Sequence, residues 1–416
     1  PKKNPSYGAG KSQATNGYTN KASSGAPIDF NVQDGQPIQL VFTDPRSGKF
    51  NLNQDAAAEL LNYEGNISFV TITGKVRTGK SFLLNKTLDV DRDGFFIDPS
   101  SDASTQGIWM WSKPYYNERD NTHVFFLDVE GSNNVEKSAQ YDAKVFALSV
   151  LLSSFFIYNS IGGIDENAIS DLSLVTQLAR NITISAEESS EHALSYYTPK
   201  FIWALRDFNA NLTDAKGQPI SANQYLESAL TDQSTGRSSD TNKKIRQALL
   251  NFFKDRDCVT FTKPADDLRR SNVSQVKPEF ARQVNILKEK IIAKAAPKQL
   301  KGVNLNTRMY VAMLQRYIDA LNQGSPLNIS NAWEYLVENE CKEAYEGSVE
   351  LYEIALKQFF LNEEKAKSVE DLYNILKSLR DSTLEKYDKN TVAVEKSQVA
   401  REFKDELKGF IDEKEQ

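Results

Sequence analysis

The distribution of apolar and polar residues divides the chain into three parts. Residues 1–27 are rich in Gly, Ser, Asn and Lys and contain hardly any aliphatic side chain. Such a segment cannot bury enough apolar surface to offset the entropy of ordering. From about residue 36 short apolar runs alternate with helical stretches, and from 303 onward only helical spacing remains. We therefore predict a disordered tail at 1–27, an α/β domain at 28–302 and a helical domain at 303–416, which we expect to be truncated.

Six short apolar runs in the middle part are the predicted strands. Several are continuous rather than alternating, which is typical of strands that are covered on both faces. Their alternation with helical segments predicts an α/β fold with a mainly parallel sheet flanked by helices. The predicted strands cover residues 38–42, 67–73, 124–128, 155–158, 201–205 and 259–262.

The last part has apolar residues at steps of three and four, which is typical of one face of a helix. A second and a third pattern follow around residues 372–379 and 395–413, so we predict an all-α helical bundle. The first helix face is predicted to consist of Val337, Cys341, Ala344, Ser348, Leu351 and Ala355.

Composition excludes several classes of protein. The net charge of −6 gives no support to a nucleic-acid partner. No run of eighteen apolar residues and no secretory signal is present, and Cys258 and Cys341 are far apart, so we expect a cytoplasmic protein without disulfides. His123 and His192 are the only histidines, and neither lies in a pattern typical of a catalytic triad or a zinc site.

The stretch TITGKVRTGKSFLLNK matches G-x-x-x-x-G-K-[ST] between a predicted strand and a predicted helix. Glycines let backbone N–H groups approach phosphate oxygens, and the N-terminus of the following helix favours negative charge. The alternative is a Gly-Lys turn on a surface loop. We expect the lysine to contact the β- and γ-phosphates and the serine to ligate Mg²⁺. The predicted nucleotide-binding residues here are Gly74, Lys75, Val76, Arg77, Thr78, Gly79, Lys80, Ser81 and Phe82.

A second carboxylate-bearing strand end accompanies this loop. In VFFLDVEG, Asp128 follows four apolar residues and Gly131 lies three residues further on. In this D-x-x-G arrangement the aspartate holds the metal through water and the glycine amide senses the γ-phosphate. Between the two motifs, STQGIWMW offers Thr105 as a second metal ligand beside Ser81, with the hydroxyl of Ser104 next to it.

Arg77 lies in the middle of the phosphate loop. An arginine there can reach the transferring phosphoryl group and act as an arginine finger from the same chain. The alternative is that its side chain points to solvent or to an acidic group of a partner.

The N-K-x-D tetrad of small guanine-specific proteins is absent from the sequence. In its place, FIWALRDF brings Arg206 and Asp207 to the carboxyl end of a predicted buried strand, where ligands of open α/β sheets bind. An aspartate there can accept hydrogen bonds from guanine N1 and N2. The alternative is an ordinary salt bridge.

Together, GKVRTGKSFLLN, TQGIWMW, LDVEGSNNVEKS and FIWALRDF resemble the guanylate-binding proteins, which are large GTPases of the dynamin superfamily. The segment from LSVLLSS to LARNI is most similar to plant and protist members. The resemblance continues through CVTFTKP and NLNTRMYVAMLQRYIDALNQG to about residue 360. It implies GTP as substrate, Mg²⁺ as cofactor and a GTPase domain followed by a helical domain.

The resemblance also implies roles for individual residues. Arg77 would stimulate hydrolysis, Glu130 would organise the attacking water, and Asp207 with Arg206 would read guanine. Residues 262–285 would cap the base, and two GTPase domains would form a homodimer there when triphosphate is bound. Animal members have a serine where this chain has Ala103, so either Ser104 replaces it or hydrolysis is slower.

Three functions follow from these features. The first is Mg²⁺-dependent GTP hydrolysis coupled to dimerisation, higher assembly and movement of the helical domain, with Arg77, Lys80, Ser104, Thr105 and Glu130 as catalytic residues. The second is a slowly hydrolysing, GTP-gated scaffold or coat protein, which Ala103 favours. The third is an atlastin-like membrane tether, which requires a membrane anchor. Recruitment to a membrane or a pathogen surface would depend on parts outside this chain.

Overall fold

The computed structural model describes residues 27–90, 93–97, 107–132, 138–183, 197–214, 216–231, 239–266, 276–361 and 368–415. Apart from Pro27, the predicted tail at 1–27 lies outside these ranges.

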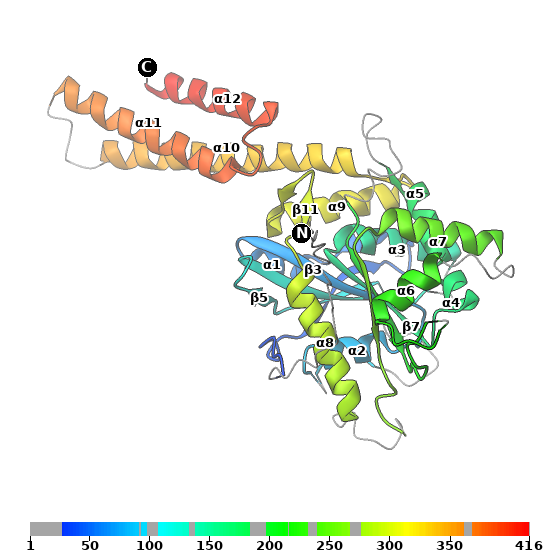
Figure 1. Ribbon diagram of the computed structural model, residues 1–416. Coiled ribbons are helices and arrows are strands. Elements are labelled where there is room, and N and C mark those ends of the chain that lie inside the picture. Colours follow the sequence, from blue (N-terminus) through cyan, green and yellow to red (C-terminus); the bar gives the residue numbers. More distant parts are fainter. Residues whose placement is uncertain are drawn as a thin grey trace, which may run out of the picture.

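A nine-stranded sheet forms the centre of the described chain (Figure 1). Its order is β10-β9-β7-β3-β6-β4-β1-β2, and β5 pairs with β6. The pairs from β10 to β6 are parallel, whereas β4, β1, β2 and β5 extend the sheet with antiparallel pairs. The fold is therefore α/β, as predicted, with a parallel centre. The strands are β1 Pro37–Thr43, β2 Phe50–Leu52, β3 Asn66–Thr73, β4 Ile108–Trp111, β5 Tyr115–Asn117, β6 Thr122–Val129, β7 Phe155–Ile161, β9 Lys200–Arg206 and β10 Arg256–Thr260.

Helices cover both faces of the sheet, which explains why its central strands are continuous apolar runs. On one face, side chains such as Phe69, Phe125 and Trp203 pack against α1, α3, α6, α7 and α9. On the other, alternate residues such as Val70 and Phe126 pack against α2 and α8. The helices of this part are α1 Gln54–Leu61, α2 Lys80–Thr87, α3 Ala139–Leu152, α4 Glu166–Asp171, η1 Ser173–Gln177, α5 Leu178–Asn181, α6 Ala222–Thr231, α7 Asp240–Phe252, α8 Pro278–Lys294 and α9 Thr307–Asn322.

Five of the six predicted strands are confirmed with ends that differ by a few residues, and the last one is displaced. The segment 259–262 was predicted as a strand, but β10 ends at Thr260 and begins at Arg256. Its charged first residues hid it from a search for apolar runs. Arg256 pairs with Glu227 of α6, and Asp257 pairs with Lys290 of α8, so both charges are paired inside the fold.

The first helix after residue 303 packs on the sheet. The ring of Tyr310 in α9 stacks on Phe69 of β3 with 3.8 Å between the ring centres. Two small pairings flank this helix, a hairpin of β11 Gln299–Leu300 with β12 Val303–Asn304, and β13 Leu327–Asn328 beside β8 Ile182–Thr183. The start of the helical part is thereby tied to the α/β part.

Three long helices then form an arm that extends away from the sheet (Figure 1). They are α10 Ile329–Leu361, α11 Val369–Thr391 and α12 Gln398–Glu415. Their common core consists of Ala344, Tyr352, Tyr387, Leu407 and Ile411.

The predicted face of α10 is correct from Val337 to Ser348 and wrong beyond it. Leu351 is 39% exposed, and Ala355 is only half-buried, because the buried stripe continues through Tyr352. Among the described helices, none combines the length and the apolar character that crossing a lipid bilayer requires.

Candidate functional site

The loop between β3 and α2 has three residues with left-handed backbone. They are Gly74 (φ 144°), Arg77 (φ 65°) and Gly79 (φ 79°). A Cβ atom on Gly74 would lie 2.2 Å from the carbonyl oxygen of Asn159 in the neighbouring β7, so only glycine fits there. The loop therefore curls at the carboxyl edge of the sheet and leads directly into the N-terminus of α2, as in a phosphate-binding loop.

Lys80 lies at the first position of α2 and is 7% exposed. Its ammonium donates to the carbonyl oxygen of Lys75 at 3.1 Å. Burial lowers the pKa of Lys80, and the negative charges of Asp128 and Glu130 act in the opposite direction. A Cβ on Gly131 would lie 2.5 Å from Cα of Val76 and 2.8 Å from the Lys80 ammonium, so glycine is needed here for the close approach of the Val76 backbone.

Ser81 and Asp128 meet beside this lysine. The Ser81 hydroxyl donates to Oδ2 of Asp128 at 2.5 Å. The contact arises because β3 and β6 are parallel neighbours, with Ile72 opposite Asp128, so both strand ends reach the same edge. A hydroxyl and a carboxylate oxygen are ligands that Mg²⁺ prefers, with phosphate oxygens and water completing its shell. The residues present therefore fit a magnesium ion.

The other loop residues are placed as follows. Lys75 forms an ion pair with Asp171 at 2.5 Å. The hydroxyl of Thr78 donates to the carbonyl oxygen of Lys75. The side-chain amide of Asn159 donates to the carbonyl oxygen of Thr78. The side chain of Arg77 is exposed. The backbone of Val76 is bonded to Ser132 in the segment after β6.

Arg206 and Asp207 stand at the end of β9, as predicted, but their side chains differ in role. Arg206 is 5% exposed and donates to the carbonyl oxygen of Gly79 at 2.9 Å. Its guanidinium lies over the rings of Phe82 and Phe280, and burial lowers its pKa to about 10. Arg206 thus supports the phosphate loop. Asp207 follows with left-handed backbone (φ 53°) and is half-buried.

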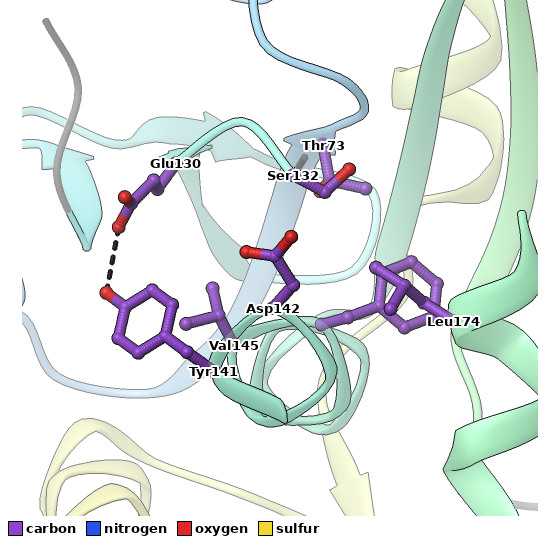
Figure 2. Close-up of a pocket in the computed structure, with 8 residues that line it drawn as sticks. Thr73, Glu130, Ser132, Tyr141, Asp142, Val145 and Leu174 are labelled. Carbon is purple, nitrogen blue, oxygen red and sulfur yellow. Dashed lines mark hydrogen bonds between the residues drawn. The ribbon is translucent and has the colours of Figure 1, made fainter. Parts of the chain in front are cut away.

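Glu130 is nearly fully buried at the entrance to the segment after β6. Its Oε2 accepts from the backbone N–H of Gly107 at 2.9 Å and from the hydroxyl of Tyr141 in α3 at 2.8 Å. Figure 2 shows this carboxylate turned toward the Tyr141 hydroxyl and away from Asp142, Thr73 and Ser132. They line a cavity of about 10 Å³, which is room for a single water molecule.

Part of the predicted site lies outside the described residues. These are Ser104, Thr105 and Ala103, together with residues 267–275 of the predicted cap. Of that cap, residues 276–285 include the start of α8.

The family profile "Guanylate-binding protein, N-terminal domain" matches residues 47–300, more than half of the chain. The chain belongs to the guanylate-binding protein family. It is 30% identical over 394 residues to guanylate-binding protein 2 of Mus musculus, covering 91% of this chain and 65% of that protein. It is 32% identical to human guanylate-binding protein 2, over 77% of this chain and 56% of that protein, and 31% identical to mouse guanylate-binding protein 1, over 92% and 65%.

This guanylate-binding protein chain thus spans about two thirds or less of the length of these curated relatives. The family is one of dynamin-like large GTPases, and the α/β part with its helical arm agrees with that fold. Among solved structures, a bacterial selenocysteine-specific elongation factor EF-Sec aligns with a TM-score of 0.30 at 14% identity, over 55% of this chain and 29% of that one, too little to support any argument.

The contacts of three residues in the site were not predicted from the sequence, although Phe280 lies within the predicted cap at 262–285. Asn159 holds Thr78 from β7, Phe280 stacks under Arg206 from α8, and Tyr141 binds Glu130 from α3. None belongs to a short motif, and only the three-dimensional neighbourhood brings them to the site of this guanylate-binding protein.

Proposed function

We propose that this chain is a Mg²⁺-dependent GTPase that hydrolyses the γ-phosphate of GTP and couples the reaction to dimerisation and to movement of the helical arm. The observation that supports this best is the site at the edge of the sheet. A left-handed glycine loop, a buried lysine and a serine–aspartate pair meet within a few ångströms of one another. Family membership agrees with the proposal.

The residues have the following proposed roles. The backbone of the loop and Lys80 bind the β- and γ-phosphates, where the substrate's negative charge replaces the solvation that the buried ammonium has lost. Ser81 and Asp128 would hold Mg²⁺, which neutralises charge on the phosphates when it is bound. Glu130 orients the attacking water. Thr105 and Ser104 are proposed to complete the site from the loop before Gly107.

Asp207 is the proposed reader of guanine. An aspartate accepts from N1–H and from the N2 amino group, whereas adenine offers neither donor in that arrangement. Exchange of Asp207 for Asn should therefore change the preferred base from guanine to xanthine, whose O2 can accept from the new amide.

The base preference is tested by measuring hydrolysis of GTP, XTP and ATP by the parent and by Asp207→Asn. We expect GTP to be preferred by the parent and XTP by the variant. A matched control is Asp214→Asn, an exposed aspartate in the same stretch that stands outside the site. Equal turnover of GTP and ATP by the parent would refute guanine recognition.

Arg77 is the proposed arginine finger. Its backbone adopts φ 65°, which costs a non-glycine residue about 1 kcal/mol. Exchange of Arg77 for Gly relieves that cost and removes the guanidinium, so we expect equal or higher stability together with turnover reduced about 10³-fold. Turnover as fast as in the parent would exclude the finger role. Unchanged GDP affinity would show that binding is intact.

The arm is the proposed moving part. The end of α9, which precedes the arm, is bonded to the site's surroundings at two points. Lys144 of α3 donates to the carbonyl oxygen of Leu321, and Asn322 exchanges two hydrogen bonds of 2.8 Å with the backbone of Phe50.

Size-exclusion chromatography with GDP, a non-hydrolysable GTP analogue and a transition-state mimic tests dimerisation. A monomer in all three conditions would refute it.

A second candidate is a slowly hydrolysing, GTP-gated scaffold, which Ala103 in the sequence favours over the serine of animal members. Light scattering with a non-hydrolysable GTP analogue and with GTP separates the two. Full assembly with the analogue and negligible turnover of GTP would support the scaffold. Assembly that requires turnover would support the enzyme.

A further inference from the structure

Glu130 accepts a hydrogen bond from Tyr141, a residue that belongs to none of the motifs in the sequence. Its Oε2 accepts from Gly107 N–H and from the Tyr141 hydroxyl, whereas its Oε1 is buried and has no hydrogen-bond partner among the described residues. A buried carboxylate oxygen without a donor is costly. Glu130 is also one of the residues that line the small cavity of Figure 2, which has room for one water molecule. A water molecule that donates to Oε1 would satisfy this oxygen.

We propose that Tyr141 is a positioning residue, which fixes the Glu130 carboxylate so that Oε2 is occupied and Oε1 is left to accept from a water molecule. This inference rests on the proposed GTPase function. It assigns to Tyr141 no contact with nucleotide or metal, and its effect on the reaction passes through Glu130.

The hydroxyl of Tyr141 is itself fixed. It has one proton, which goes to Glu130, so the contact of 3.2 Å with Thr43 is one in which the threonine hydroxyl donates to the tyrosine oxygen. Burial raises the pKa of Tyr141 far above its ordinary value, which keeps this proton in place. The tyrosine therefore acts as a donor of constant orientation.

The ring of Tyr141 is fixed as well. It stacks on Phe50 of β2 with 5.4 Å between the ring centres and 12° between the planes. Phe50 is held in turn through its backbone by the side-chain amide of Asn322 at the end of α9. Since α3 and β2 both hold this ring, rotation of Tyr141 away from Glu130 would disturb its stacking.

Gly107 connects the Glu130 carboxylate to the segment that precedes β4. Its backbone carbonyl accepts from Glu130 N–H at 2.8 Å, while its own N–H donates to Oε2. Gly107 is the first described residue after the segment that carries Ser104 and Thr105. The carboxylate that Tyr141 orients therefore also anchors the end of the loop in which we propose the second metal ligand.

Four variants of the full chain test the proposal, namely Tyr141→Phe, Glu130→Gln, the double variant and the control Tyr387→Phe. The control removes the hydroxyl of another tyrosine, which is buried in the arm and donates to Ala400 O at 2.9 Å. Single-turnover GTP hydrolysis and GDP affinity are measured for each. We expect Tyr141→Phe to lower the hydrolysis rate about tenfold, as for loss of a hydrogen bond to a charged group. GDP affinity should stay within about twofold.

The double variant tests whether Tyr141 acts through Glu130. If Tyr141 acts through Glu130, removal of its hydroxyl in the Glu130→Gln background should change the rate by less than about twofold. An equal tenfold loss in both backgrounds would overturn the proposal, and so would a rate for Tyr141→Phe equal to that of the parent and of Tyr387→Phe. A parent chain that binds GTP without any turnover would refute the proposed function itself, and the positioning role with it.

Discussion

Lys298 offers a quantitative test of how the α/β part is stabilised. Its ammonium is 5% exposed and donates to the carbonyl oxygen of Ser153, near the C-terminus of α3. Among the described residues no carboxylate contributes to its pKa, which burial lowers from 10.5 to about 7. A lysine with such a pKa destabilises the folded state whenever it carries its charge, because the buried ammonium is less well solvated than in the unfolded chain.

The cost follows from the difference between the two pKa values. That difference corresponds to about 5 kcal/mol at pH 7. Exchange of Lys298 for Met keeps the length of the side chain and removes the charge. It also leaves the Ser153 carbonyl without this donor, which costs about 1–3 kcal/mol. We therefore expect Lys298→Met to be more stable than the parent by about 2–4 kcal/mol at pH 7.

The advantage should shrink as the pH rises. Between about pH 7 and 10.5 the unfolded lysine keeps its proton while the folded one has lost it, so the parent's stability rises with pH. The methionine variant lacks this contribution. The difference in unfolding free energy should therefore fall with a slope that approaches about 1.4 kcal/mol per pH unit above pH 7, which amounts to about 2 kcal/mol from pH 7 to 9.

The assay is urea unfolding at pH 7, 8 and 9, followed by circular dichroism and tryptophan fluorescence, whose coincidence checks for a single transition. Lys288→Met is the matched control. Lys288 is also buried, but it pairs with Asp89 at 2.5 Å, so its exchange should destabilise the chain by leaving Asp89 without this partner. A Lys298→Met variant less stable than the parent by a constant amount would refute the reasoning.

Two further substitutions test the site and the arm. Gly74→Ala places a Cβ 2.2 Å from Asn159 O at φ 144°, so we expect a loss of about 2 kcal/mol in stability and at least tenfold weaker GDP binding by calorimetry. Unchanged affinity and melting temperature would contradict the loop geometry. Glu340 in α10 is buried near Arg308, and burial raises its pKa, so folding is favoured as the pH falls. Glu340→Gln removes this buried charge and should therefore be more stable than the parent at pH 7. That advantage should shrink toward pH 5 in urea unfolding, and a variant less stable than the parent at pH 7 would contradict it.

Much of the fold could be predicted from the sequence because the patterns that indicate its strands each lie within a single segment. The strands at the centre of the sheet are buried on both faces, so β3, β6, β7 and β9 appear as continuous apolar runs. β10 was misplaced because Arg256 and Asp257 are paired within the fold, and such pairing cannot be read from one segment. The short β2 and β5 carry too few residues to show a period.

The site was accessible in part for the same reason. Fixed spacing within one loop predicts Gly74, Gly79, Lys80 and Ser81. The contact of Asp128 with Ser81 follows once two strands are assumed to be parallel neighbours. The hydroxyl of Tyr141 and the support of the loop by Arg206 depend instead on how helices and strands pack, over separations of 11 and 127 residues.

We propose that the loop from Gly74 to Ser81 binds a guanosine polyphosphate with magnesium. Titration calorimetry of the folded chain with GDP, a non-hydrolysable GTP analogue and the corresponding adenosine compounds, with and without Mg²⁺, tests it most directly. We expect heat of binding for the guanine compounds alone, its dependence on Mg²⁺ for the triphosphate analogue, and its loss in Lys80→Met. Absence of heat with every guanine nucleotide, on material with a native circular dichroism spectrum, would contradict it.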